Sequence, residues 1–255
     1  MTFEKWQALG NDYVIVGEPV DADTVRAICD RHAGIGADGV LLLEQPDAPG
    51  FVARVRIFNP DGSEAEISGN GVRQALLYLH RRGWTDARRF SVQTIAGEIR
   101  ATILDERTCS VDMGRARVGE EATVAGRRGR ELSIGNPQFA IRVDSLGELE
   151  GLDVPAIGPP IETDARFPNR TNVSFWTELR SDAIRARIFE RGAGETRSSG
   201  TGAIGAAVAH ILRGGDSPVT VHLDGGELTV DVGEDHHVDL TGWAEPVFAG
   251  EWPIA

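Results

Sequence analysis

The stretch RVRIFNPDGSEAEISGNGVRQALLYLHRRG at residues 54–83 returns 131 positions later as RARIFERGAGETRSSGTGAIGAAVAHILRG at residues 185–214. The two segments share 11 of 30 residues with no insertion, and the agreement continues through the loops SGNG at 68–71 and SGTG at 199–202. Chance similarity between two unrelated strand–loop–helix segments would rarely keep register through a loop. The repeat therefore predicts a chain built from two copies of one fold.

The same pattern predicts the secondary structure of each copy. A strand precedes each glycine-rich loop, and the helices expected after the loops, at 71–82 and 202–213, both end in Arg-Gly, a common C-terminal stop. The polar stretch 115–130, which carries five Arg, is a candidate connector between the copies. The other elements expected are strands at 14–16, 40–43, 52–58, 99–104 and 229–232, and a helix at 23–32 capped by Asp21 or Asp23.

Length and composition describe an ordinary globular chain. Its 255 residues allow one large domain or two smaller ones, each able to bury its own core. The formal net charge of −13 disfavours nucleic acid and anionic membranes as partners. No apolar run approaches the roughly 20 residues of a membrane span, and the N-terminus lacks the features of a signal peptide, so we expect a cytoplasmic protein. Cys29 and Cys109 are expected to be buried core thiols, which suits a reducing compartment.

Ser68 and Ser199 lie where each repeated loop meets its helix. Glycines let a backbone approach a ligand closely, and a helix N-terminus offers free N–H groups and the positive end of the dipole. A serine at a helix start is most often an N-cap, and a lone Ser-Gly-x-Gly says little about function. The occurrence of the motif twice in register favours a shared site to which both loops contribute amides and a hydroxyl.

Six motifs resemble those of the diaminopimelate epimerase family, occur in that family's order and span nearly the whole chain. They are LGNDY at 9–13, GIGADG at 34–39, FNPDGS at 58–63, SGNGVR at 68–73, GNP at 135–137 and ERGAGET at 190–196. The resemblance implies an α/β (α+β) fold of two pseudo-twofold-related domains, each a mixed sheet wrapped around a central helix, with the active site between them. The first domain is expected over residues 1–116 with a C-terminal tail at about 247–255, and the second over 117–246.

The resemblance also implies the chemistry. Members of the family use no cofactor and no metal, and they invert an α-carbon with two cysteines, one from each domain, which remove and deliver the α-proton on opposite faces. Ser68 and Ser199 stand at these two positions in this chain. The expected partner is a small amino-acid substrate, and a homodimer is a further expectation. The residues that the resemblance assigns to substrate binding are Asn11, Asn59, Gly69, Asn70, Asn136, Asn172, Glu190, Arg191, Gly200 and Thr201.

The chain departs from the family's pattern at its most reactive positions. Serine replaces both cysteines, and Gln7 and Gln138 stand where the family usually has histidines. An unactivated serine is not deprotonated near neutral pH, and neither loop supplies an evident His or Lys base. The four differences together are typical of a natural, divergent homologue.

Three functional interpretations follow. The first is a cofactor-independent epimerase or racemase that acts on diaminopimelate, in lysine biosynthesis, or on a related amino acid through Ser68 and Ser199. The second is an isomerase whose acid/base groups are carboxylates such as Glu190 or Asp12. The third is an amino-acid-binding protein that has lost turnover.

Overall fold

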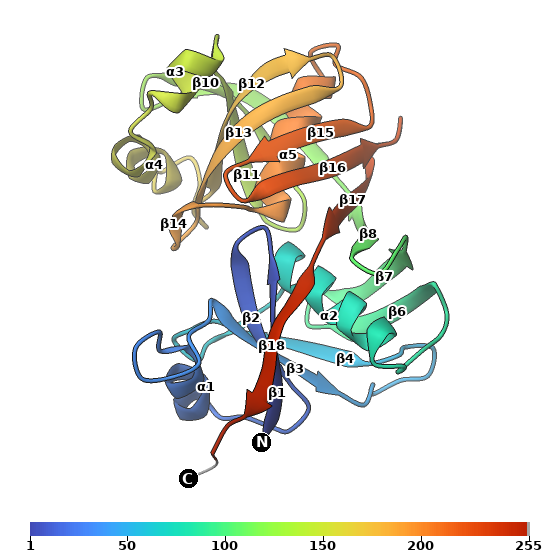
Figure 1. Ribbon diagram of the computed structural model, residues 1–255. Coiled ribbons are helices and arrows are strands. Elements are labelled where there is room, and N and C mark those ends of the chain that lie inside the picture. Colours follow the sequence, from blue (N-terminus) through green and yellow to red (C-terminus); the bar gives the residue numbers. More distant parts are fainter. Residues whose placement is uncertain (254–255) are drawn as a thin grey trace. The chain divides into compact units, whose positions relative to one another are not determined.

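The computed structural model describes residues 1–253, and the chain separates into two compact units (Figure 1). Unit 1 comprises Met1–Asp112 and the segment that starts at Gly242, and unit 2 comprises Met113–Thr241. The sequence analysis placed these boundaries after residues 116 and 246. Residues 254–255 of the expected C-terminal tail lie outside the described residues.

Unit 1 is a mixed sheet that surrounds helix α2. Strands β2 and β3 are parallel, as are β4 and β6, whereas β1 pairs antiparallel with both β2 and β18. Helix α2 packs against β1, β2, β3, β4 and β7, so the sheet encloses it from several sides. The elements are β1 (Thr2–Ala8), β2 (Asn11–Val16), α1 (Ala22–Cys29), β3 (Gly39–Glu44), β4 (Arg54–Phe58), β5 (Glu64–Ala65), α2 (Gly69–Arg81), β6 (Arg89–Thr94), β7 (Gly97–Ile103) and β18 (Glu245–Glu251).

Unit 2 repeats this plan around helix α5. The parallel pairs are β11–β12 and β13–β15, and α5 packs against β10, β11, β12, β13, β15 and β16. Strands β8 (Thr108–Arg115) and β17 (His237–Trp243) run across the unit boundaries. The other elements are β9 (Arg117–Val124), β10 (Arg127–Ser133), β11 (Pro137–Arg142), α3 (Leu146–Glu150), α4 (Val154–Glu162), β12 (Asn172–Arg180), β13 (Ala183–Glu190), β14 (Gly194–Thr196), α5 (Gly200–Ile211), β15 (Val219–Leu223) and β16 (Gly226–Val232).

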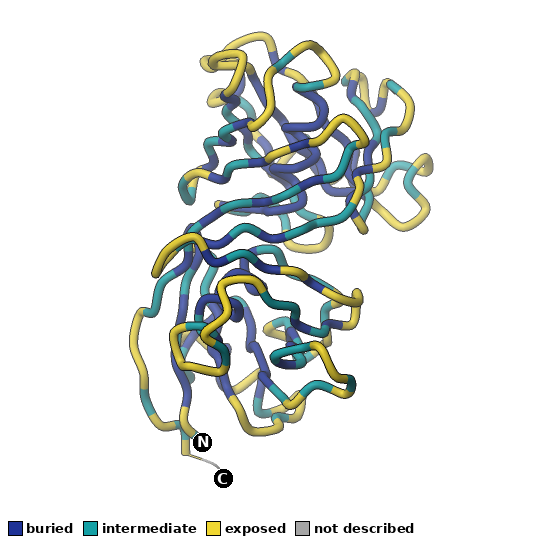
Figure 2. The backbone as a smooth tube through the Cα atoms, turned by 90° about the vertical axis from the view of Figure 1, so that its right-hand side faces the viewer, coloured by how far each residue is buried: buried dark blue, intermediate teal, exposed yellow. Residues whose placement is uncertain are grey.

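Helix α5 is enclosed because its sequence allows close packing. Helix α5 reads GTGAIGAAVAHI, and its residues from Gly200 to His210 are all buried. Glycine and alanine keep the helix thin enough for the sheet to approach; a Cβ added at Gly202 would collide with the side chain of Ile188. Figure 2 shows buried residues in the interior of each unit and exposed residues at the outer loops of the described chain.

The repeated segments adopt the same local structure. Strands β4 and β5 lead into α2 as β13 and β14 lead into α5. The residue before each helix has nearly the same backbone conformation, with φ −137° and ψ 116° at Ser68 and φ −138° and ψ 120° at Ser199. Both helices begin two residues earlier than predicted, because the glycines at 69 and 200 already belong to the first turn. The expected mixed sheet around a central helix is thus found in each unit.

One local prediction was wrong, and another was confirmed except for the end of its helix. The polar stretch 115–130 is no connector: it forms most of an antiparallel hairpin of β9 and β10 that turns at Ala125 (φ 47°) and Gly126 (φ 76°). Its arginines lie on these two strands, where Arg128 and Arg130 form ion pairs with Glu121. The polar composition that predicted a connector is therefore that of a polar strand face. The helix expected at 23–32 is present and capped by Asp21, but it ends at Cys29, where the Asp30 side chain accepts the backbone N–H groups of His32 and Ala33.

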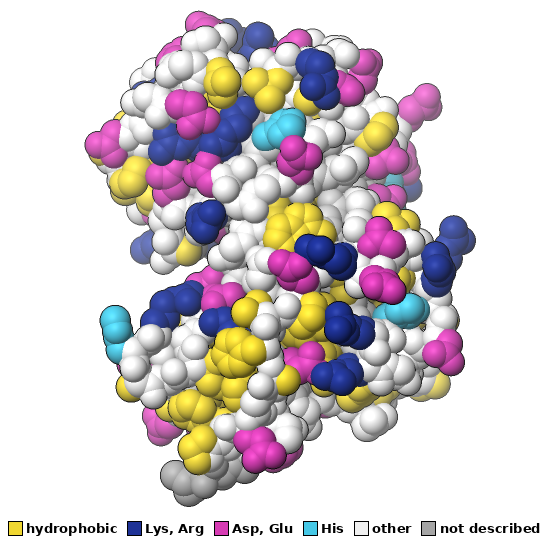
Figure 3. All heavy atoms as spheres, in the orientation of Figure 1, with side chains coloured by type: hydrophobic (Ala, Val, Ile, Leu, Met, Phe, Trp, Pro, Cys, Tyr) yellow, Lys and Arg dark blue, Asp and Glu magenta, His cyan; other side chains and the backbone are white. Residues whose placement is uncertain are grey.

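Charges of both signs are interspersed on the face drawn in Figure 3, so no single-sign field covers it. Many of the acidic residues are paired; the guanidinium of Arg56, for example, donates to both carboxylate oxygens of Glu64 at 2.7 and 2.8 Å. Among the residues that the structure describes, no helix has the length and hydrophobicity needed to cross a bilayer.

The core of unit 2 gives a first test. Phe139 is fully buried in a cluster with Val173 and Phe175. Phe139→Ala should lower the free energy of unfolding by about 3–5 kcal/mol, because the cavity it leaves can collapse only in part. Leu146→Ala, at the exposed start of α3, should change it by less than about 0.5 kcal/mol. Urea denaturation followed by circular dichroism measures both, and equal losses would contradict the described core.

Candidate active site

Each serine of the repeated loops caps the helix that follows it. Ser68 Oγ accepts the Gly71 N–H at 3.1 Å, and Ser199 Oγ accepts the Gly202 N–H at 3.2 Å. The ordinary N-cap interpretation is therefore confirmed for both serines. An N-cap role does not exclude a catalytic role for either serine. Each cap fixes a hydroxyl oxygen at the positive end of a buried helix, where developing negative charge is stabilised.

Ser199 has a carboxylate as its second partner. Its hydroxyl donates to Glu190 Oε2 at 2.8 Å, and the Thr196 hydroxyl donates to Glu190 Oε1 at 2.7 Å. Burial raises the pKa of the Glu190 carboxyl group, and the two hydroxyl donors offset only part of that effect. A carboxylate with a raised pKa accepts a proton more readily than an exposed one, so Glu190 can serve as the base that the sequence analysis did not find for Ser199.

Ser68 has a phenol as its second partner. The hydroxyl of Tyr13, on β2, donates to Ser68 Oγ at 3.1 Å. Sequence reasoning missed this residue: Tyr13 appeared only as the last letter of the LGNDY motif. The contact depends on the pairing of β2 with β3, which sets Tyr13 opposite Gly39, a residue too small to push the ring away, and no signal in the sequence alone indicates it.

A buried arginine adds positive charge beside Ser68. Arg73 is fully buried in the first turns of α2 and donates to Gly69 O at 3.1 Å and to Asn70 Oδ1 at 2.6 Å. Burial lowers the pKa of its guanidinium to about 10, which leaves it charged at neutral pH. Within the described residues its Nε atom has no hydrogen-bond partner. The charge reinforces the helix dipole and holds the amide of Asn70 in one orientation.

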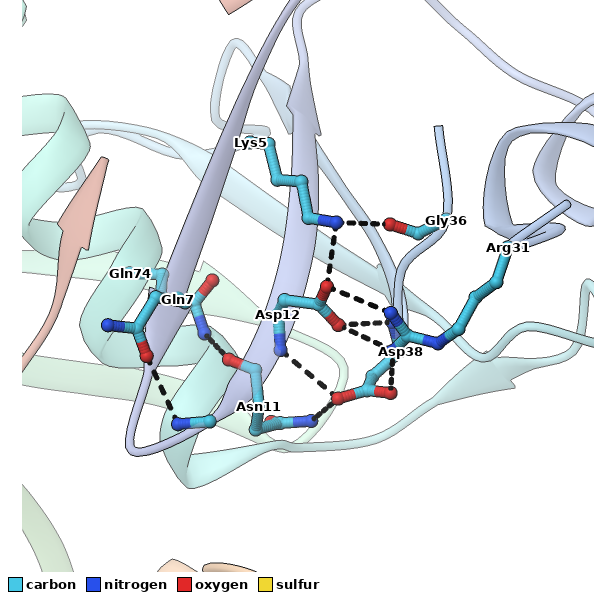
Figure 4. Close-up of polar contacts among 9 residues, drawn as sticks. Lys5, Gln7, Asn11, Asp12, Arg31, Gly36, Asp38 and Gln74 are labelled. Carbon is cyan, nitrogen blue, oxygen red and sulfur yellow. Dashed lines mark hydrogen bonds and ion pairs between the residues drawn. The ribbon is translucent and has the colours of Figure 1, made fainter. Parts of the chain in front are cut away.

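Asn11 is held by its neighbours in unit 1 (Figure 4). Its side-chain Nδ2 donates to Asp38 Oδ2 at 2.7 Å, and its backbone carbonyl accepts from Gln74 Nε2 at 3.0 Å. The hydrogen bond to Asp38 fixes the position of the Asn11 amide nitrogen and thus the orientation of the side-chain amide. A substrate-binding role for Asn11 would therefore depend on Asp38.

Asp12, next to Asn11, is the centre of a cluster of charges. Its carboxylate contacts Lys5 Nζ at 2.8 Å and Arg31 Nη2 at 2.8 Å, and Arg31 also contacts Asp38 at 2.6 Å (Figure 4). Burial raises the pKa of Asp12, but the hydrogen bonds and charges of Arg31 and Lys5 outweigh it and hold that pKa below its ordinary value. A carboxylate stabilised in this way is a poor proton acceptor, so Asp12 suits the acid/base role less well than Glu190 does.

Two further groups of predicted residues come together within unit 2. Asn136 Nδ2 donates to Thr201 Oγ1 at 3.2 Å, and Gln138 Nε2 donates to Asn136 Oδ1 at 2.7 Å. Separately, Asn172 Oδ1 accepts the backbone N–H of Arg191 at 2.7 Å, which ties a buried strand residue to the loop after Glu190. Gln138 therefore orients the side-chain amide of Asn136, and its own amide is not an acid or a base near neutral pH.

The remaining predicted residues lie in turns or helix starts. Asn59 is held in the turn after β4, where its Nδ2 donates to Ser63 Oγ at 3.0 Å. Gly69 and Gly200 are the first residues of α2 and α5. Gln7 accepts from Gly10 N at 3.1 Å and donates to Glu245 at 2.8 Å, so it stabilises the β1–β2 turn.

Neither cysteine of the chain is placed to supply a reactive thiolate. Cys29 and Cys109 are both buried and free, as expected from the sequence. Burial raises the pKa of the Cys29 thiol to about 11 and that of the Cys109 thiol to about 12, so neither forms a thiolate near neutral pH. Among the described residues, no group of three His, Cys, Asp or Glu side chains is placed to hold a metal ion.

Comparisons with known proteins agree over the whole chain. The family model for diaminopimelate epimerase matches residues 3–119 and 131–246. A diaminopimelate epimerase from Pelotomaculum thermopropionicum is 42% identical over 283 aligned positions, with 99% of each chain covered, and one from Moorella thermoacetica is 38% identical with 100% covered. A solved structure of a probable proline racemase from Agrobacterium radiobacter shares the fold, with a TM-score of 0.74 at 16% identity over 100% of this chain and 93% of that chain.

Glu190 makes stability depend on pH in a predictable direction. Because its folded-state pKa is raised, its stabilising contribution is complete below the ordinary value of 4.5 and is lost as the pH rises through the folded-state pKa. Glu190→Gln removes that loss, so the variant should gain thermal stability over the unmodified protein as the pH rises from 4 to about 8. The exposed Glu106→Gln is the control and should show no such trend. A difference between the Glu190 variant and the unmodified protein that stays constant with pH would refute the assignment.

Proposed function

The chain belongs to the diaminopimelate epimerase family, a family of isomerases, and on that premise we propose that it inverts the α-carbon of diaminopimelate without a cofactor, as a step of lysine biosynthesis. The observation that carries the proposal is the pair of serine hydroxyls, Ser68 and Ser199, each fixed at the N-terminus of a buried helix. They stand where the family has its two cysteines. We propose that one serine acts on each face of the α-carbon.

On the Ser199 side the carboxylate of Glu190 supplies the basicity. As the α-proton moves to Ser199 Oγ, the serine's own proton moves to Glu190 Oε2, so the C–H bond breaks and the carboxylate becomes a carboxylic acid. The sequence-based role of Glu190, contact with the substrate's ammonium group, stays a prediction. Both of its oxygens already accept hydrogen bonds from Thr196 and Ser199, which favours the proton-accepting role.

We propose that the helix N-termini bind the substrate's α-carboxylate. Free amides of the first helical turn and the dipole stabilise an anion there, and the buried charge of Arg73 strengthens the effect at α2. The same groups stabilise the negative charge that develops when the α-proton leaves. The predicted binding residues Asn11, Asn136 and Asn172 have their amides oriented by neighbouring side chains or backbone.

We also propose that the reaction is independent of pyridoxal phosphate and takes place in the cytoplasm. A pyridoxal cofactor is anchored through a lysine, and the chain's single lysine, Lys5, is held by Asp12 at 2.8 Å and by the carbonyl of Gly36. Two free buried thiols suit a reducing compartment.

Hydrogen exchange at the α-carbon tests the proposal directly. The protein should incorporate solvent deuterium at Cα of diaminopimelate and interconvert the LL and meso forms, which NMR and chiral chromatography measure. Ser68→Ala and Ser199→Ala should each lower inversion by at least about 10²-fold, because inversion needs a group on each face. If the substrate binds but neither exchanges nor inverts, the protein is an amino-acid-binding homologue and the proposal fails.

Restoring both thiols should raise the activity. Cysteine is more acidic than serine, and a helix N-terminus lowers the thiol pKa further, so Ser68→Cys combined with Ser199→Cys should accelerate epimerisation on the order of 10²-fold. Either substitution alone should help much less. Steady-state kinetics on all three variants measures this, and a double variant that folds and binds substrate but is no faster would contradict the proposed roles of the two positions.

A further inference from the structure

The hydroxyl of Tyr13 is a partner of Ser68 to which the proposed function gives no role. Tyr13 is buried, with 6% of its surface exposed, and its hydroxyl lies 3.1 Å from Ser68 Oγ. The ring occupies the space left by Gly39, since a Cβ there would collide with the ring and with the carbonyl of Phe58. The backbone pairing of β2 and β3 therefore holds this phenol against the serine.

The hydrogen bonds give the two serines opposite roles. A hydroxyl has one proton and two acceptor lone pairs. Ser68 Oγ accepts the Gly71 N–H and lies 3.1 Å from the Tyr13 hydroxyl. With Tyr13 as the donor of that pair, both lone pairs of Ser68 Oγ are used and the serine's own proton is available for another acceptor. Ser199 donates its proton to Glu190 and, among the described residues, accepts from Gly202 alone, which leaves one lone pair available. Ser68 is arranged as a proton donor and Ser199 as a proton acceptor.

We propose that Tyr13 is a positioning residue for catalysis, one that orients the Ser68 hydroxyl and replaces its proton when Ser68 protonates the α-carbon. The inference rests on the proposed epimerase function and adds the group that makes Ser68 competent. It also assigns Ser68 as the serine whose hydroxyl carries the proton to be donated before the reaction begins.

The proton balance is simple. The Ser68 O–H bond breaks as the new Cα–H bond forms, and the Tyr13 O–H bond breaks as its proton passes to Ser68 Oγ, which leaves a phenolate. In the reverse direction the α-proton moves to Ser68 Oγ while the serine's proton returns to the phenolate. A phenol, with an ordinary pKa near 10, gives up a proton far more readily than a serine hydroxyl does. The α2 N-terminus and the buried Arg73, which donates to Gly69 O, supply positive charge in the turn that follows Ser68.

The first test separates the hydroxyl from the ring. Tyr13→Phe keeps the packing against Gly39 and should lower kcat for epimerisation by about 10²-fold with KM changed less than about twofold. Tyr78→Phe is the matched control: the chain has two tyrosines, and Tyr78 lies on α2 with its ring packed against Trp6. The control should stay within about twofold of the unmodified protein. A Tyr13→Phe variant with unchanged kcat, or an equal loss in both variants, would overturn the inference.

The second test asks whether Tyr13 acts through Ser68. A thiol supplies its own acidity, so in the Ser68→Cys, Ser199→Cys background the Tyr13→Phe change should cost less than about twofold in kcat. A loss as large as in the serine protein would show that Tyr13 acts elsewhere and would contradict the inference.

A third measurement does not depend on turnover. In the Ser68→Cys protein, the pH dependence of alkylation reports the pKa of the introduced thiol, because Cys29 and Cys109 are buried. Loss of the phenol's hydrogen bond in Ser68→Cys, Tyr13→Phe should raise that pKa, and Tyr78→Phe should leave it unchanged. No change on Tyr13→Phe would overturn the inference even if the protein is an epimerase. An inactive unmodified protein with the expected thiol shift would defeat only the proposed function.

Discussion

The hydrogen bond between a serine hydroxyl and the first turn of a buried helix is the interaction on which both candidate sites depend. It fixes Ser68 Oγ over the N-terminus of α2 and Ser199 Oγ over that of α5 with nearly identical backbone geometry. Each helix is packed against several strands of its own sheet, and in α5 small residues let those strands approach closely. The reactive oxygen, the helix amides and the positive dipole are therefore fixed relative to one another in each unit.

What differs between the units is the second partner of each serine. The Ser199 hydroxyl is hydrogen-bonded to the carboxylate of Glu190, whose pKa is raised. The Ser68 hydroxyl is hydrogen-bonded to the phenol of Tyr13. The proposed mechanism combines two of the hypotheses drawn from the sequence, serine acid/base chemistry and carboxylate acid/base chemistry. In that proposal each serine transfers the proton to or from the substrate, and its neighbour supplies the acidity or basicity that a serine lacks. Asp12, the other carboxylate considered, forms ion pairs with Lys5 and Arg31.

Sequence reasoning predicted the repeated strand–loop–helix segments and both serine caps because these depend on local chemistry: glycines in the loops, small residues in the helix and register kept through 30 positions. It could not predict contacts made by strand pairing. Tyr13 meets Ser68, 55 residues later, only because β2 pairs with β3 opposite Gly39, and no local pattern encodes that encounter. The polar hairpin at 115–130 was predicted as a connector for a related reason. Its arginines pair with a glutamate on the facing strand, and the sequence alone shows only that the segment is polar. Helix α4 was missed because its Pro155, Pro159 and Pro160 are typical of loops.

A crystal structure of the protein with diaminopimelate bound would test the central claim, that two hydroxyls fixed at helix N-termini carry out the inversion. The account predicts that the α-carbon lies about 3–3.5 Å from both Ser68 Oγ and Ser199 Oγ, on opposite faces, with the α-carboxylate against the helix amides. The hydroxyl of Tyr13 and the carboxylate of Glu190 should still contact their serines. A complex in which either serine lies out of reach of the α-carbon would contradict the account.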